Sequence, residues 1–131
     1  MAIGIEDESP VSIVRLFNEP AGREYLADQG VPADFIEKLP LLGISGVANM
    51  LSAIKFAKWY ELTGNDVVMT LGTDSMAMYA SRLNEMNDER GEFTAQDAAG
   101  VYHRHLMGQG LDHVQELGYY DRKRIHNLKY Y

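Results

Sequence analysis

Residues 41–85 alternate between short apolar runs and helical patterns, and this alternation constrains the fold more than any other feature of the sequence. The run LLGI at 41–44 is followed by a glycine turn and a long helical pattern. The segment DVVMTL, Asp66 to Leu71, is rich in β-branched residues, and a second glycine turn and a second helix follow it. This repeat predicts two short parallel strands joined by a crossover helix.

The two helices of this region are indicated by apolar residues that recur on one face. We expect the first helix to run to about Leu62, where Gly64-Asn65 ends it, and the second to follow Ser75. The apolar positions are Val47, Met50, Leu51 and Ile54 in the first helix, and Met76, Tyr79, Ala80 and Leu83 in the second.

Two parallel strands are too few to complete a sheet, because parallel sheets are normally covered on both faces. We therefore expect an α/β fragment that is mostly helical, in which the strands form part of a larger sheet. The chain reads as a single or partial domain with a helical lead-in at 1–40, a βαβα unit at 41–90 and C-terminal helices at 91–131.

Proline and glycine mark the predicted helices outside this unit. Ser9-Pro10 indicates a helix start, Pro20 opens a helix that Gly30 closes, and Pro32 opens a third. Thr94 and Asp97 resemble a capping box. Further short helices are expected at 111–117 and at the C-terminal end of the chain.

Composition excludes several classes of protein. The 131 residues contain no cysteine, which removes disulfides, thiolate metal sites and a cysteine nucleophile. No apolar run reaches membrane-spanning length, and the acidic N-terminus is unlike a signal peptide, so we expect a cytoplasmic protein without membrane contact. A net charge of −7 argues against nucleic-acid binding. The basic stretch around Arg122–Arg124 is either a helix end that complements the acidic body or a phosphate or RNA contact.

The two glycine turns are the candidate binding sites, because ligands of open α/β sheets lie beyond the carboxyl ends of the strands. Gly43, Ile44, Ser45 and Gly46 offer backbone amides and a hydroxyl at a helix N-terminus. Thr73 and Asp74 add a hydroxyl and a carboxylate at the second turn. The alternative is structural, since serine and aspartate cap helices and glycine turns corners. The four histidines show no metal-ligand spacing, and no metal site is expected.

Three segments carry a resemblance to a known family. LLGISGVANMLSAIKFAKWYELTGNDVVMTLGTDSMAMYASRL, LFNEPAGREYL and YYDRKRIHNLKYY resemble the C-terminal part of pyridoxal-phosphate enzymes of the tryptophan synthase β-like (fold-type II) superfamily, in the cysteine synthase-like branch. The resemblance implies that the loop Gly43-Ile44-Ser45-Gly46 lies beside the cofactor ring. It also implies that Thr73 or Asp74 meets the pyridine nitrogen.

The resemblance also implies what this chain lacks. In the family, the Schiff-base lysine and the phosphate loop lie upstream of the segments matched here, and Lys55 and Lys58 do not correspond to that lysine. We therefore expect the C-terminal, cofactor-side portion of a β-elimination or β-replacement enzyme. Alone it would be inactive and hold no pyridoxal phosphate, and only the complete enzyme would act on an amino-acid substrate.

A second hypothesis needs no catalysis. The chain would then be a stand-alone helical module that oligomerises through the exposed edge of its sheet. The expected partner is either another copy of the chain, giving a homo-oligomer, or the missing N-terminal portion.

Overall fold

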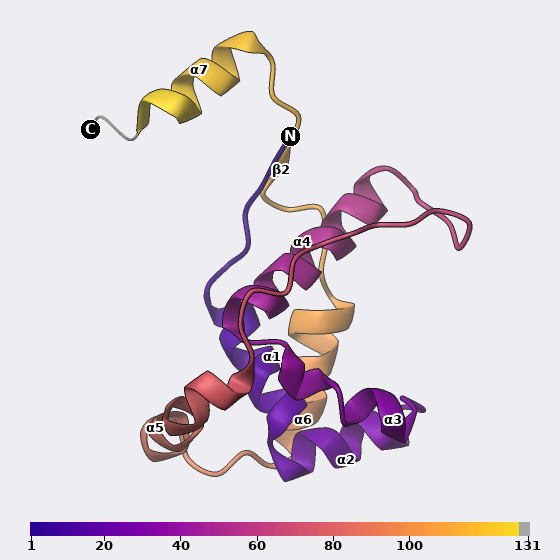
Figure 1. Cartoon of the computed structure of the whole chain (residues 1–131), viewed down its shortest axis with the longest axis vertical. Helices are drawn as coiled ribbons and strands as arrows, with labels where there is room; N and C mark the ends of the chain where they lie inside the picture. The colour runs from indigo at the N-terminus through magenta and orange to yellow at the C-terminus, as the bar shows by residue number, and fades with distance from the viewer. Residues whose placement is uncertain (129–131) are drawn as a thin grey trace.

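The computed structural model describes residues 1–128, and most of them are helical (Figure 1). A long helix, α4, lies beside a cluster of shorter helices, and the two short strands join segments from the two ends of the chain. In chain order the elements are β1 (Ala2–Ile3), α1 (Glu8–Asn18), α2 (Pro20–Asp28), α3 (Ala33–Ile36), η1 (Leu39–Leu41), α4 (Ile44–Trp59), η2 (Met76–Tyr79), α5 (Ala80–Arg90), α6 (Ala95–Val101), η3 (Tyr102–Met107), β2 (Val114–Gln115) and α7 (Tyr119–Asn127).

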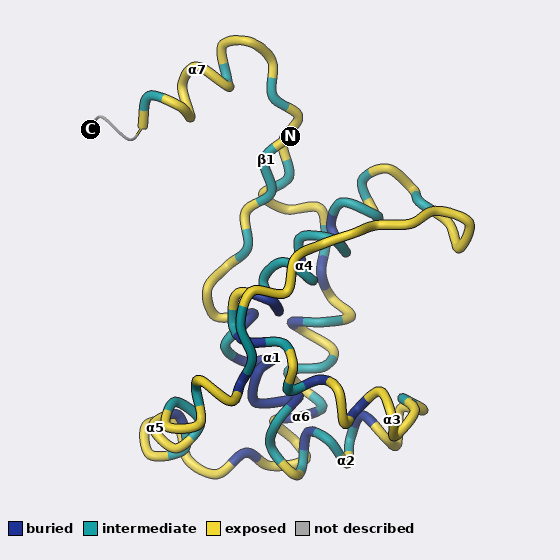
Figure 2. Tube along the Cα trace, in the orientation of Figure 1, coloured by how far each residue is buried: buried dark blue, intermediate teal, exposed yellow. Residues whose placement is uncertain are grey.

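Helix α1 is the centre of the core, and its trace is mostly buried in Figure 2. It packs against α2, α4, α6 and the π-helical turn η3. Its apolar residues Ile13, Val14 and Leu16 are completely buried. They contact a core that the other helices supply through Leu26, Val47, Leu51, Met86, Phe93 and Ala98, among others.

The local helix signals in the sequence are largely confirmed. Pro20 occupies the first position of α2, and Gly30 follows that helix with a φ of 86°, a left-handed conformation that glycine adopts without strain. Thr94 and Asp97 form the predicted capping box of α6, in which each side chain bonds the backbone of the other residue. Ser9 is different: α1 begins at Glu8, so Ser9 lies inside the helix and its side chain does not cap it.

The predicted parallel α/β unit is wrong. Residues 39–41 form a 3-10 turn and Ile44 already begins α4, so LLGI is not a strand. Asp66–Leu71 runs extended along α4 but pairs with no strand within residues 1–128. The two strands that the structure describes, β1 and β2, are antiparallel, with Ala2 opposite Gln115. β-branched residues favour an extended backbone, but a ladder also requires a neighbouring strand.

The segment after η3 is held against α4 and does not form the helix expected at 111–117. His113 has a φ of 58°, and its carbonyl accepts a hydrogen bond of 2.9 Å from the Gly4 amide beside the β1–β2 pair. Lys55 of α4 is only 2% exposed, and its Nζ donates to the carbonyl and the carboxylate of Asp112 at 2.7 and 2.9 Å. Lys58 donates to the carbonyl of Gln109.

The longest helix, α4, has 16 residues. Within residues 1–128 no single helix is long and apolar enough to cross a bilayer. The pair Ala33–Leu41 and Ile44–Trp59 passes the same length and composition test only together, across a bend of 117°.

Helix α7 extends away from the rest of the molecule and buries none of its residues (Figure 1). The helix expected near the C-terminal end is therefore present, and it carries Arg122, Lys123 and Arg124 of the basic stretch. Lys129, the last cation of that stretch, lies outside the described residues.

We predict that Gly22→Ala destabilises the fold, because a Cβ at this position would lie 2.2 Å from the Leu16 carbonyl oxygen of α1. Separating the two backbones costs about 3 kcal/mol of unfolding free energy. Urea denaturation measures this loss. Gly100→Ala in α6 is the matched control, because its Cβ would meet open space; it should add about 0.5–1 kcal/mol. Equal stability of the Gly22→Ala variant and the parent would contradict the close contact.

Candidate functional site

The two glycine turns singled out in the sequence lie against each other. The amide of Gly43 donates a hydrogen bond of 2.8 Å to the carbonyl of Asp74. Gly43 is buried just before α4, and a Cβ there would lie 2.7 Å from the Asp74 carboxylate carbon. Only glycine therefore fits at position 43 without moving Asp74. The two turns are thus in contact, although the parallel strands expected before them are not formed.

The Asp74 carboxylate is held by two hydroxyl groups. Thr73 Oγ1 donates to one oxygen at 2.9 Å, and the Tyr79 hydroxyl donates to the other at 2.5 Å. The Tyr79 bond, and then the Thr73 bond, hold the pKa of Asp74 below its ordinary value. The same carboxylate raises the pKa of Tyr79. At neutral pH the cluster is thus a carboxylate that accepts from two protonated hydroxyls.

The remaining predicted site residues lie on the first turn of α4. Ile44 begins the helix, and Ser45 is exposed one residue later. Gly46 is buried, and a Cβ there would lie 3.2 Å from a methyl group of Leu42. Gly46 therefore serves helix packing, whereas Gly43 makes room for Asp74.

Sequence reasoning assigned Tyr79 only to an apolar helix face. It lies in η2, five residues after Asp74, and the turn folds back so that its hydroxyl reaches the carboxylate. A tyrosine shortly after a predicted polar turn is the one sequence signal that points to this contact, and it does not distinguish the contact from core packing.

The residues of the turn fit part of the requirements for a pyridoxal phosphate ring. Each oxygen of Asp74 accepts one hydrogen bond, and a carboxylate oxygen keeps a second lone pair that can accept from a further donor. Thr73 is exposed, and its hydroxyl, which donates to Asp74, keeps lone pairs that can accept a further bond. The amines of Lys55 and Lys58 are bound to the segment at 109–112.

Two of the four histidines, His103 and His105, are bonded to neighbouring helices. His105 is buried, and its Nδ1 lies 3.0 Å from Ser9 Oγ of α1. His103 Nε2 lies 3.2 Å from the Tyr25 hydroxyl. In the part of the chain that the structure describes, no three histidine, aspartate or glutamate side chains gather as metal ligands do.

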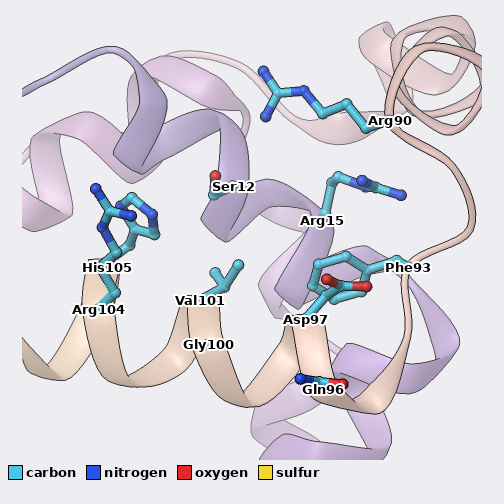
Figure 3. Close-up of a pocket in the computed structure, with 10 residues that line it drawn as sticks. All are labelled: Ser12, Arg15, Arg90, Phe93, Gln96, Asp97, Gly100, Val101, Arg104 and His105. Atoms are coloured by element: carbon cyan, nitrogen blue, oxygen red, sulfur yellow. The ribbon is translucent and has the colours of Figure 1, made fainter.

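A separate cavity of about 470 Å³ lies between α1, the end of α5 and the α6–η3 helix (Figure 3). We call it the arginine cavity, because Arg15, Arg90 and Arg104 line it. None of the predicted site residues contributes to its walls. The other lining residues are Ser12, Phe93, Gln96, Asp97, Gly100, Val101 and His105.

We predict that Tyr79→Phe raises the pKa of Asp74 toward its ordinary value, because the largest stabilising contact of the carboxylate is removed. Carboxyl ¹³C shifts followed by NMR during a pH titration measure the change. Because folding lowers this pKa, the associated stability is present above the unfolded-state pKa and is lost as the pH falls through the folded value. The exposed Tyr60→Phe is the matched control, and an unchanged Asp74 titration in Tyr79→Phe would contradict the bond.

No model of a known protein family matches this chain, and no curated protein or solved structure matches it either.

Proposed function

We propose that this chain is the cofactor-side portion of a pyridoxal-phosphate enzyme that performs β-elimination or β-replacement on an amino acid. A second polypeptide region supplies the Schiff-base lysine and the phosphate loop. The observation that carries this proposal is the contact between Gly43 and Asp74. The motif resemblance requires both turns to lie beside one cofactor ring, and the contact meets that requirement.

Thr73 is the residue that faces the pyridine nitrogen in this proposal. Its side chain is exposed, whereas Asp74 is partly buried and already accepts from Thr73 and Tyr79. Asp74 therefore acts as a positioning residue that holds the Thr73 hydroxyl, and Tyr79 fixes Asp74 in turn. The bound cofactor would supply the electron sink for carbanion chemistry, and Thr73 would turn its proton from Asp74 to an unprotonated pyridine nitrogen, which moderates that sink.

The extended segment Asp66–Leu71 supports the need for a second polypeptide. Val67 and Met69 are 87% and 90% exposed, and Leu71 is also exposed. The four residues 67–70 line a hollow against α4 together with Phe56. The backbone groups of residues 67–70 make no hydrogen bond within residues 1–128. An exposed apolar segment with unpaired backbone groups is suited to pairing with a strand of a partner.

A second copy of this chain is the competing partner. Two copies of residues 66–71 could pair around a two-fold axis and satisfy their backbone groups. This pairing would leave Val67, Met69 and Leu71 of both copies on an open face, because no further layer covers them. A different polypeptide that supplies both a strand and a covering layer would bury that face. The exposed apolar face therefore favours a different polypeptide over a second copy of this chain.

We predict that the isolated chain does not develop the visible absorption band of lysine-bound pyridoxal phosphate. The band should appear when the chain is co-expressed with the polypeptide encoded immediately upstream, because the lysine is expected there. Thr73→Val should shift the position of that band in the complex, whereas Ser81→Ala, at an exposed hydroxyl of α5, should leave it unchanged. A stoichiometric band in the isolated chain would contradict the proposal.

We predict that Met69→Glu prevents assembly with the upstream polypeptide and leaves the melting temperature of the isolated chain unchanged, because Met69 contacts little of its own fold. Size-exclusion chromatography with light scattering measures assembly. Met107→Glu, at an exposed methionine of η3, is the matched control. Assembly by Met69→Glu at parental affinity would exclude this segment as the docking surface.

A further inference from the structure

The arginine cavity lies apart from the Thr73–Asp74 turn, and its volume of about 470 Å³ is in the range of small-ligand sites, roughly 300–1,000 Å³. Arg15 comes from α1, Arg90 ends α5 and Arg104 lies on η3. Three elements distant in sequence thus bring guanidinium groups to one cavity, in a chain whose net charge is −7.

Arg15 is a built-in positive charge of the cavity wall. It is only 6% exposed, and its Nη2 donates to Asn87 Oδ1 at 2.5 Å and to the Gly91 carbonyl at 2.7 Å. Its guanidinium also lies 4.9 Å from the centre of the Phe93 ring. The nearest carboxylate oxygen, on Glu19, is 3.9 Å from Nε, and neither of these two atoms has a hydrogen bond. The position of this charge is therefore fixed by neutral groups.

Arg104 is the cation without a counter-charge. Its guanidinium makes no hydrogen bond or ion pair within residues 1–128. It lines the arginine cavity and also a neighbouring cavity of about 170 Å³. In Figure 3 it rises from η3 on the opposite side of the cavity from Arg90.

The acidic groups near the cavity are engaged elsewhere. Asp97 is the one carboxylate in the wall, and its Oδ2 accepts from the amide and hydroxyl of Thr94 in the capping box. Glu8 bonds Arg90 at 2.6 and 3.2 Å, but both side chains are partly exposed. Arg90 bonds both oxygens of Glu8, so an anion that binds Arg90 must displace this two-point pair, and a dianion is better suited to do so than a monocarboxylate.

The neutral groups of the wall suit an oxyanion. Ser12 lies between Arg90 and Arg104 in Figure 3, and its hydroxyl, which donates to Glu8, becomes available when an anion displaces Glu8. Gln96 adds an amide. Burial lowers the pKa of His105, so its ring is neutral at pH 7 and adds no charge to the wall. Gly100 and Val101 leave an apolar floor for the organic part of a ligand.

We propose that the arginine cavity binds a small phosphate monoester, with Arg90 and Arg104 as the groups that hold the phosphate. A guanidinium binds phosphate through two parallel hydrogen bonds, and a dianion matches two such groups better than a monocarboxylate does. Arg15 contributes positive potential behind them. This site is independent of the proposed function at Thr73.

The test is an amide NMR titration of the chain with glycerol 3-phosphate, inorganic phosphate and glycerol. We expect saturable shifts at Gly91, Gly100 and Arg104 with glycerol 3-phosphate, weaker shifts with inorganic phosphate and none with glycerol. Arg104→Gln should weaken binding of glycerol 3-phosphate by about tenfold or more at an unchanged melting temperature, because one charge-assisted pair is lost. Arg122→Gln, an exposed arginine of α7, is the matched control.

Two outcomes would overturn the proposal. One is the absence of saturable shifts at these residues with millimolar glycerol 3-phosphate. The other is equal affinity of the Arg104→Gln variant, the Arg122→Gln variant and the parent, since it would show that the phosphate binds elsewhere. Stronger binding of inorganic phosphate than of glycerol 3-phosphate would show that the cavity does not accommodate the organic part of a phosphate monoester. Pyridoxal phosphate is left out of the titration, so that failure here does not bear on the Thr73 site.

Discussion

The burial of α1 on nearly all sides is the constraint on which the rest of the structure depends. A short helix at the centre of a small core must have its polar side chains satisfied by its neighbours, because each buried group left without a partner costs about 1–3 kcal/mol. Ser9 contacts His105 of η3, Ser12 donates to Glu8, and Arg15 donates to Asn87 and Gly91. The contacts of Ser9 and Arg15 fix where η3 and α5 lie relative to α1, whereas the Ser12 bond lies within α1.

Both candidate sites follow from this arrangement. On one side, α1 packs against α4 through a core that includes Val47 and Leu51, which positions the N-terminus of α4 and the Gly43–Asp74 contact. On the other side, the same helix provides Ser12 and Arg15 to the arginine cavity. Both sites therefore depend on the burial of α1, and they use different residues of the chain.

Sequence reasoning predicted the features that depend on neighbouring residues. The capping box at Thr94 and the proline start of α2 need only a few adjacent residues, so their patterns are visible in the sequence. The strand at Asp66–Leu71 required a partner strand, which local composition cannot supply, and the segment is extended but unpaired. Ser9 was taken for a helix cap because its distant partner, His105, leaves no local pattern.

The two glycine turns lie against each other without the sheet on which the sequence reasoning placed them. The physical reason is that α4 anchors the second turn directly: Asn49 Nδ2 donates to the Leu71 carbonyl at 3.0 Å, and the Gly43 amide bonds Asp74. The arginine cavity had no such signal, because its three cations lie on separate elements.

These two anchors also link the exposed segment to the site. The apolar side chains of Val67 and Met69 precede Leu71, where the first anchor holds the backbone to α4, and Thr73 follows two residues later. A partner that covers the segment therefore binds against a backbone whose end is fixed beside Asp74. In the proposed enzyme, the surface that recruits the second polypeptide and the hydroxyl that meets the cofactor are parts of one short stretch of chain. Assembly would accordingly bring the lysine-bearing region to the side of the molecule where Thr73 lies.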